Sequence, residues 1–250
     1  MNICLFEQNE IEKPLSFEDA RAQHILKVLK KKQGDDFTAG IIGSSSGLAH
    51  ITKIDEAAGQ IFFDFTPTGD GKPLNPLKMI VGFPRPIQLR RLLRDVAALG
   101  VNELHLTGTE LGEKSYMQSD LAQPDAAREL LKEGSVQAGS THVPQVFVHK
   151  SLSTAVPEAL EGPHKQQLIC LDNINPACSL GEVKFSADVP VIAAIGSERG
   201  WTDRERKLLE DAGFIRCGMG SRIMRTETAA TVAGAIILNS MGRLSGQARQ

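Results

Sequence analysis

Apolar and polar residues alternate along the early part of the chain as they do in short, half-buried strands. The alternation predicts strands over 37–42, 48–54 and 61–65. Turn-forming residues separate these strands at 43–47 and 56–59, which is typical of hairpins. Ahead of them, apolar residues at helical spacing predict one helix over 16–29. Residues 1–70 are therefore expected to form a small, mainly β domain.

The pattern changes after a stretch rich in proline and glycine at 67–76, which predicts a linker. Beyond the linker, strand-like runs alternate with helical runs, and this order predicts an α/β fold for residues 76–250. The predicted strands cover 79–83, 103–107, 145–149, 168–172, 189–195 and 214–217. The predicted helices cover 87–99, 119–137, 153–160, 203–212 and 226–241. A capping box at Thr202–Glu205 marks the start of one of them.

Composition and charge narrow the class of protein. Hydrophobic residues make up 41% of the chain, as in globular proteins, and the net charge of −2 gives no global attraction to nucleic acid. A nucleic-acid site would therefore be local, and each basic cluster is open to the alternative of a solvated charged face. The candidates are His24, Lys27, Lys30, Lys31 and Lys32 in one cluster, and Arg85, Arg90, Arg91 and Arg94 in another.

Targeting and cysteine patterns indicate a cytoplasmic protein. No apolar run reaches the length of a membrane span, and the first residues lack the features of a signal peptide. The four cysteines are scattered without a C-x-x-C pair, so neither a disulfide framework nor a metal site is expected.

Two glycine-containing loops stand out in the last third of the chain, at 196–200 and 218–229. Each follows an apolar run and precedes a helical pattern, which is where open α/β sheets bind ligands. A dinucleotide fingerprint is excluded because Ile223 occupies its third glycine position. P-loop and H-E-x-x-H motifs are also absent from the sequence.

The two loops resemble those of a known family. Ile195–Gly200 is similar to its I-G-P-E-G-G loop, and Met219–Ala229 to its L/M-G-x-R-I-L/M-R-T-E-T-A loop. Further similarity lies at 98–101, at 137–139 and at 24–29 near the start. On these motifs the chain resembles the 16S ribosomal RNA uracil-N3 methyltransferase family of the SPOUT superfamily.

The resemblance implies an architecture and a cofactor. It implies a trefoil-knotted α/β SPOUT domain after an N-terminal PUA-like RNA-binding β-barrel, and S-adenosyl-L-methionine held at the knot. It also implies a homodimer that acts on ribosomal RNA or the small ribosomal subunit, with no membrane association. The cofactor-binding residues that it implies are Leu171, Asp172, Asn173, Gly196, Ser197, Glu198, Gly200, Met219, Gly220, Ile223, Met224, Thr226 and Thr228.

The chemistry of such a reaction favours particular residues. Methylation of uracil at N3 requires loss of the N3 proton and stabilisation of the resulting anion. Arg225 suits the second task because its guanidinium keeps its charge. Either Glu227 or Glu198 is suited to accept the proton, with a structural role as the alternative for each. Arg225 and Glu227 are the predicted catalytic residues.

N3 lies on the Watson–Crick edge, so the target uridine is expected to be unpaired or flipped out. The expected RNA contacts are His24, Lys27, Lys30, Arg85, Arg90, Arg94 and Arg222.

The chain departs from the family pattern at several positions. Ser197 replaces a proline, and Arg199 replaces a glycine in the first loop. Asp95 and Ala98 stand where the family has a lysine and a glutamate. Two alternatives therefore stay open, namely a methyltransferase with a different RNA target and a catalytically silent RNA-binding protein.

Overall fold

A computed structural model describes residues 2–245 of the chain. Its contacts divide the chain into two compact units, which are described separately here. Unit 1 comprises residues 1–73 and 135–143, and unit 2 comprises residues 74–134 and 144–250. Within the described residues, the strands form a five-stranded sheet and a seven-stranded sheet.

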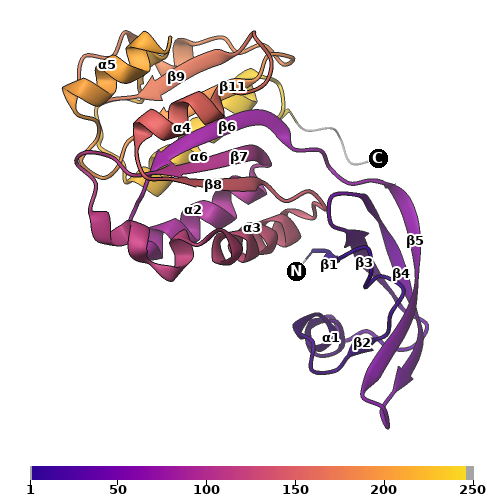
Figure 1. The fold of residues 1–250 in the computed structure, drawn as a ribbon. Coiled ribbons are helices and arrows are strands. Elements are labelled where there is room, and N and C mark those ends of the chain that lie inside the picture. The colour runs from indigo at the N-terminus through magenta and orange to yellow at the C-terminus, as the bar shows by residue number, and fades with distance from the viewer. Residues whose placement is uncertain (1, 246–250) are drawn as a thin grey trace. The chain divides into compact units, whose positions relative to one another are not determined.

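Unit 1 is built on the five-stranded sheet, in the order β1-β3-β4-β5-β2 (Figure 1). Its strands are β1 (Cys4–Phe6), β2 (Leu15–Ser16), β3 (Asp36–Ile41), β4 (Ser45–Asp55) and β5 (Gln60–Asp70). β1 is parallel to β3 and the other pairings are antiparallel, so the sheet is mixed. Buried side chains on β3, β4 and β5, such as Phe37, Ile51 and Phe63, form its core.

The helix predicted over 16–29 is shorter than expected. α1 (Ala20–Gln23) starts after Asp19, whose side chain accepts a hydrogen bond from the Arg21 backbone N–H. It continues as a π-helical turn, η1 (His24–Val28). Ile25 on this turn is buried in the core of the unit, whereas Lys27 is exposed.

The prediction of a linker at 67–76 is largely wrong, because strands occupy most of that segment. β5 continues to Asp70, pairing Pro67 with Gly47 and Asp70 with Ser45 of β4. A proline is tolerated there because, among residues 2–245, no strand pairs with the other side of that part of β5. β6 then begins at Asn75, so only residues 71–74 lie between strands.

The segment 135–143 packs with unit 1 although the sequence gives no sign of it. Thr141 Oγ1 donates a hydrogen bond of 2.7 Å to the carbonyl of Ser44, and Lys72 Nζ donates one of 3.2 Å to that of Ala138. Gly40 lies so close to Thr141 that an added Cβ would come within 2.4 Å of its methyl group. The early and middle parts of the chain are therefore joined inside one unit.

Unit 2 is built on the seven-stranded sheet, in the order β10-β12-β9-β11-β6-β7-β8, and its pairings are parallel. Its strands are β6 (Asn75–Gly82), β7 (Val101–Thr107), β8 (Gln145–His149), β9 (Gln167–Leu171), β10 (Cys178–Ser179), β11 (Val191–Ile195) and β12 (Ile215–Gly218). The helices are α2 (Pro86–Ala98), α3 (Pro124–Ala138), α4 (Leu152–Ala159), α5 (Asp203–Asp211) and α6 (Thr226–Ser240), with 3-10 turns η2 (Lys114–Gln118), η3 (Asp120–Ala122) and η4 (Leu180–Glu182). Residues 135–138 at the end of α3 belong to unit 1.

Helices cover both faces of this sheet, as an all-parallel sheet requires (Figure 1). Side chains alternate along β6, so that Met79 meets α6 beside Gly234 while Ile80 packs with α4 and α5. The predicted α/β fold is confirmed for this unit. The helix predicted over 119–137 is corrected at its start, because Pro124 begins α3 and proline favours a first helical position.

Candidate functional site

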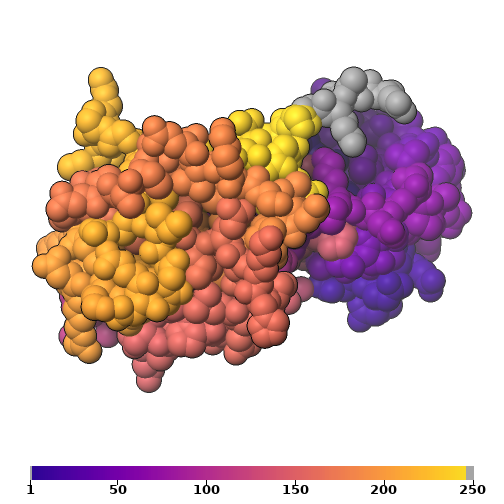
Figure 2. Space-filling view, turned by 90° about the horizontal axis from the view of Figure 1, so that it is seen from above, coloured from indigo at the N-terminus to yellow at the C-terminus, as the bar shows by residue number. Residues whose placement is uncertain are grey.

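Three loops leave the same edge of the seven-stranded sheet side by side. β9 pairs with β11 on one side and with β12 on the other, placing Leu171 opposite both Ile195 and Cys217. All three strands are parallel, so the residues that follow them emerge together at their carboxyl ends. In Figure 2 the later segments of unit 2, salmon to yellow by the bar, form one continuous surface. The fold thus gathers the predicted cofactor residues 171–173, 196–200 and 219–224.

The loop 196–200 is a tight turn that depends on its glycines. The Gly200 N–H donates to the Ser197 carbonyl at 2.8 Å, and Gly200 has a φ of +72°. A Cβ on Gly196 would lie 3.0 Å from the Gly200 backbone. Arg199, where the family pattern has glycine, extends from this turn as an exposed side chain. The backbone reversal needs glycine at positions 196 and 200.

Hydrogen bonds connect this turn to its neighbours. Trp201 Nε1 donates to the carbonyl of Leu171 at 3.1 Å, and Thr226 Oγ1 donates to that of Gly196 at 3.3 Å. Thr109 Oγ1 donates to Ser197 Oγ at 2.8 Å, and Ser197 is buried. The serine that replaces the family's proline therefore anchors the turn to the loop after β7.

Asp172 braces the first loop with its side chain. Its Oδ2 lies 2.6 Å from Arg206 Nε of α5, and its Oδ1 accepts the Ile174 N–H at 3.0 Å. Arg206 also donates to Asp203 at 2.8 Å. The hydrogen bond to Asp172 raises the pKa of Arg206, with a further rise from Asp203 and an opposing effect of burial. The sequence analysis did not single out Arg206, which lies 34 residues from its partner.

The third loop is more open. Gly220 has a φ of +88°, Met219 and Met224 are half-buried, and the Ile223 side chain is 84% exposed. Arg222 is exposed as well. The backbone and side chains of this loop are therefore accessible to a bound molecule.

The two predicted catalytic residues flank the start of α6. Arg225 is the N-cap residue, in an extended conformation, and its side chain is exposed without capping the helix. Glu227 lies in the first helical turn and is only 6% exposed. Thr226 is buried beside it, whereas Thr228 is exposed. Arg225 is thus open to a bound molecule, and Glu227 is largely covered.

The structure also places a predicted RNA-binding residue against a predicted cofactor-binding one. Arg85 Nε lies 3.3 Å from Glu198 Oε1, with side chains 60% and 36% exposed. Hydrogen bonding to Tyr116, followed by the charge of Glu198, raises the pKa of Arg85. Arg90 and Arg91 are exposed on α2, whereas Arg94 Nε donates to Glu133 of α3 at 2.7 Å. Arg94 is therefore partly neutralised before any RNA binds.

The basic residues of unit 1 lie on the short helical segment. Lys27 and Lys30 are exposed, and Lys30 has a φ of +53°. Among the described residues, His24 Nε2 is buried and makes no hydrogen bond. The two lysines are accessible to a nucleic acid, and the histidine is half-buried.

A pocket next to the loops was not foreseen from the sequence. A cavity of about 410 Å³ lies at the carboxyl ends of β6, β7 and β8. Thr109, which holds Ser197, belongs to its wall, and Lys150 lines both this cavity and a neighbouring one of about 240 Å³. Its lining includes Phe83, Lys114, Met117 and Gln118. No local motif connects these residues, because β6, β7 and β8 bring them together from distant positions.

The fold and the three converging loops define an RNA methyltransferase domain, and the family model of that description matches residues 71–238. The ribosomal RNA small subunit methyltransferase E of Treponema pallidum is 44% identical, covering 95% of this chain and 91% of that protein. Ribosomal RNA small subunit methyltransferase E 1 of Borreliella burgdorferi is 30% identical, covering 96% and 98%. The chain belongs to the ribosomal RNA small subunit methyltransferase E family.

A solved structure supports the fold over both units. The ribosomal RNA small subunit methyltransferase E of Neisseria gonorrhoeae, described as bound to S-adenosyl methionine, matches with a TM-score of 0.76 and 22% identity. The match covers 96% of this chain and 97% of that one. Within residues 2–245, none of the helices has both the length and the apolar character needed to cross a membrane.

Proposed function

We propose that this protein transfers a methyl group from S-adenosyl-L-methionine to N3 of a uridine in the 16S ribosomal RNA of the small subunit. Family membership supports the reaction class. The observation that carries the proposal is the register of β9 between β11 and β12, which brings three separate loops to one edge. Ribosomal RNA as substrate favours action in the cytoplasm.

The three loops would surround the cofactor. Positive φ angles at Gly200 and Gly220 leave backbone groups able to approach a ligand closely. The relative from Neisseria gonorrhoeae is described as bound to the same cofactor. Asp172 would act mainly by shaping its loop, since Arg206 already engages its carboxylate. S-adenosylmethionine supplies an activated methyl group, so the protein has to align the acceptor and stabilise its charge.

The path of the chain supports a trefoil knot. β12 comes late in the sequence yet lies between β9 and β10, and the chain then returns to pack α6 against β6. Insertion of a late strand between earlier ones is consistent with a threaded C-terminal segment, which would be an exception to the rule that chains do not thread loops. The mixed sheet of unit 1 is in turn consistent with the proposed PUA-like barrel.

Arg225 and Glu227 would divide the chemistry of the base. Arg225 is exposed at the head of α6, where its guanidinium can donate to the uracil anion as the methyl group is transferred. Glu227 would accept the N3 proton, directly or through water. Its burial restricts this transfer to a base placed directly over the start of α6.

The RNA would be held by exposed basic side chains. Arg90 and Arg222 are accessible on unit 2, and Lys27 and Lys30 are accessible on unit 1. Each would contact phosphates, which position the RNA without reading its sequence.

We also propose that the protein is a homodimer. α6 is apolar on nearly all sides, as helices buried in a core or an interface are. Ile223, just before α6, and Ile87, at the start of α2, are 84% and 64% exposed in the single chain. A closed two-fold interface would cover such side chains. Analytical ultracentrifugation of the full chain tests this, and a monomer at micromolar concentration would contradict it.

Analysis of modified nucleosides tests the proposed reaction. Small ribosomal subunits from a strain that lacks the gene are incubated with the protein and labelled S-adenosylmethionine, and the product is mapped. The expected product is 3-methyluridine at one position of the 16S RNA. Label at another base atom, or in another RNA, would redirect the proposal to a different target.

A further inference from the structure

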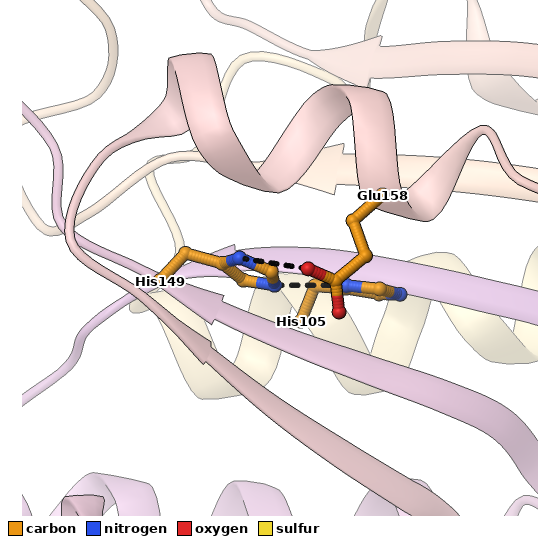
Figure 3. Close-up of side chains that lie close together, drawn as sticks. All are labelled: His105, His149 and Glu158. Carbon is orange, nitrogen blue, oxygen red and sulfur yellow. Dashed lines mark hydrogen bonds and ion pairs between the residues drawn. The ribbon is translucent and has the colours of Figure 1, made fainter.

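Three side chains from different elements meet beneath α4, at the β8 edge of the seven-stranded sheet (Figure 3). His105 comes from β7, His149 ends β8, and Glu158 extends from α4. Their potential ligand atoms all lie within 4.8 Å of one another. Both histidines are buried, while the side chain of Glu158 is 44% exposed and gives access from solvent.

A hydrogen-bonded carboxylate fixes the protonation of the inner histidine. His105 Nε2 lies 3.2 Å from Glu103 Oε2, and His105 Nδ1 lies 3.0 Å from His149 Nε2. A carboxylate only accepts hydrogen bonds, so the His105 Nε2 atom carries the proton and its Nδ1 atom presents a lone pair. Phe147 stacks on the ring of His105, with centroids 4.8 Å apart, and holds its orientation.

The charged groups around His105 and His149 leave one carboxylate, that of Glu158, available to a cation. Lys78 Nζ lies 2.9 Å from Glu103 Oε2, so the inner carboxylate is already balanced. Glu158 Oε2 lies 3.8 Å from His149 Nδ1, and no positive charge other than a protonated histidine is recorded beside it among the described residues. Burial lowers the pKa of both histidines, which favours the neutral imidazole that metal ions bind.

We propose that His105, His149 and Glu158 form a binding site for a divalent transition metal ion such as Zn²⁺. The ion would take the place of the proton that His149 Nε2 now directs at His105 Nδ1, and the His149 ring would remain neutral by carrying that proton on Nδ1 instead. Glu158 would be the third ligand and water the fourth, with Glu103 in the supporting position that carboxylates commonly take behind a metal-bound histidine.

The rearrangement needed is small. In a tetrahedral zinc site with nitrogen ligands at 2.0–2.1 Å, two ligand nitrogens lie about 3.3 Å apart. The histidine nitrogens would have to separate by a few tenths of an ångström from their present 3.0 Å. Glu158 has further to move, but its side chain is exposed and free to change rotamer. The bound ion would tie α4 to both β7 and β8.

Metal titration of the untagged full chain tests the proposal. After treatment with a chelator and desalting, the protein is titrated with Zn²⁺ by calorimetry and with Co²⁺ by visible absorption. One equivalent should bind, and the cobalt spectrum should show ligand-field bands of a nitrogen and oxygen site. His149→Gln and Glu158→Gln should abolish stoichiometric binding, and Glu103→Gln should weaken it by about 10- to 100-fold.

The controls separate this site from other sources of metal binding. His164→Gln changes an exposed histidine of the same unit outside the cluster and should leave binding unchanged. The Sγ atoms of Cys178 and Cys217 lie 3.6 Å apart, so binding there would produce a thiolate-to-cobalt charge-transfer band. Such a band, unchanged binding in Glu158→Gln, or no saturable binding in the wild type would each overturn the proposal. Because Glu158 is exposed, its variant stays informative even if His149→Gln fails to fold.

Discussion

The loop site at the ends of β9, β11 and β12 and the histidine cluster under α4 both lie on unit 2, yet the sequence reveals them very differently. The loop site is encoded in two contiguous stretches, 196–200 and 218–229, whose glycines and charged residues form a pattern. His105 and His149 lie 44 residues apart, and only the register of β7 with β8 brings them together. Chemistry carried by loops can thus be found from local motifs, whereas chemistry assembled across a sheet requires the fold.

The largest effect is expected at the loop site, from Arg225→Ala. The turnover rate should fall by about 100- to 1,000-fold, as when one donor to a developing anion is removed. Cofactor affinity should stay within about threefold, because Arg225 is exposed and does not cap α6 through its side chain. Single-turnover methylation and cofactor titration measure the two quantities. Arg225→Lys keeps the charge but loses the paired donors, so its turnover rate should lie between those of the wild type and the alanine variant. Unchanged turnover in the alanine variant would remove Arg225 from the mechanism.

Gly82→Ala tests whether packing behind the turn shapes the cofactor site. The added Cβ would lie 2.5 Å from the Ser197 backbone nitrogen and 2.9 Å from Thr109, so the loop 196–200 has to shift. Overpacking of this kind costs about 1–3 kcal/mol of unfolding free energy. Cofactor affinity should fall at least about tenfold, which corresponds to about 1.4 kcal/mol.

The matched control for this substitution is Gly69→Ala in β5. An added Cβ there has nothing within 4 Å. Its free energy of unfolding should change by about 0.5 kcal/mol or less. Equal cofactor affinity in the two variants would show that the turn tolerates displacement.

The histidine cluster should make the metal-free protein sensitive to mild acid. Burial lowers the pKa of His105 and His149 in the folded chain, so the unfolded chain binds more protons below about pH 6.5. Their contribution to stability is therefore complete above that pH and is lost as the pH falls through the lowered folded values. The free energy of unfolding should change with pH by at most about 1.4 kcal/mol per pH unit for each histidine. Urea unfolding with chelator present measures the free energy of unfolding from pH 7 to pH 5. This free energy should fall less steeply with pH in His149→Gln than in the wild type, and parallel curves would contradict this assignment.

Two arginines on α2 allow the proposed RNA contacts to be tested against each other. Arg90 is exposed, whereas Arg94 is engaged by Glu133. Arg90→Ala should weaken binding to ribosomal RNA several-fold and reduce the slope of log affinity against log salt by about one. Arg94→Ala should have a smaller effect. Filter binding at a series of salt concentrations measures both, and a larger effect at Arg94 would reverse the assignment.

The smallest effect is expected from Arg199→Gly, which restores the residue of the family pattern. Arg199 is exposed beside a turn that already has glycine at positions 196 and 200. Cofactor affinity should stay within about threefold or rise, since the turn does not depend on this side chain. A large loss in calorimetric titration would show that Arg199 has become a ligand contact in this chain.

Local sequence patterns predict the part of the fold that does not depend on contacts between distant residues. The alternation of strands and helices gave the α/β unit, and the capping box at Thr202–Glu205 marked the start of α5 correctly. The segment 67–76 was wrongly expected to be a linker because proline and glycine outweighed the pairing that β4 provides. Packing of 135–143 with unit 1 depends on contacts such as Thr141 with Ser44, which lie 97 residues apart.

The same limit applies to the candidate site. The motifs identified the loops that meet at the edge of the sheet, but not the residues that hold them in place. By sequence Ser197 is only a departure from the family pattern, whereas in the fold its hydroxyl accepts a hydrogen bond from Thr109. Arg206 and Trp201 gave no signal because their partners, Asp172 and the Leu171 carbonyl, lie at distant positions.

Calorimetric titration of the wild-type chain with S-adenosylmethionine and its demethylated product tests the central claim most directly. The three converging loops predict saturable binding of one cofactor per chain, strongly weakened in Gly82→Ala and retained in Arg225→Ala. Failure of the folded wild-type protein to bind either molecule would contradict the claim that these loops form a cofactor site.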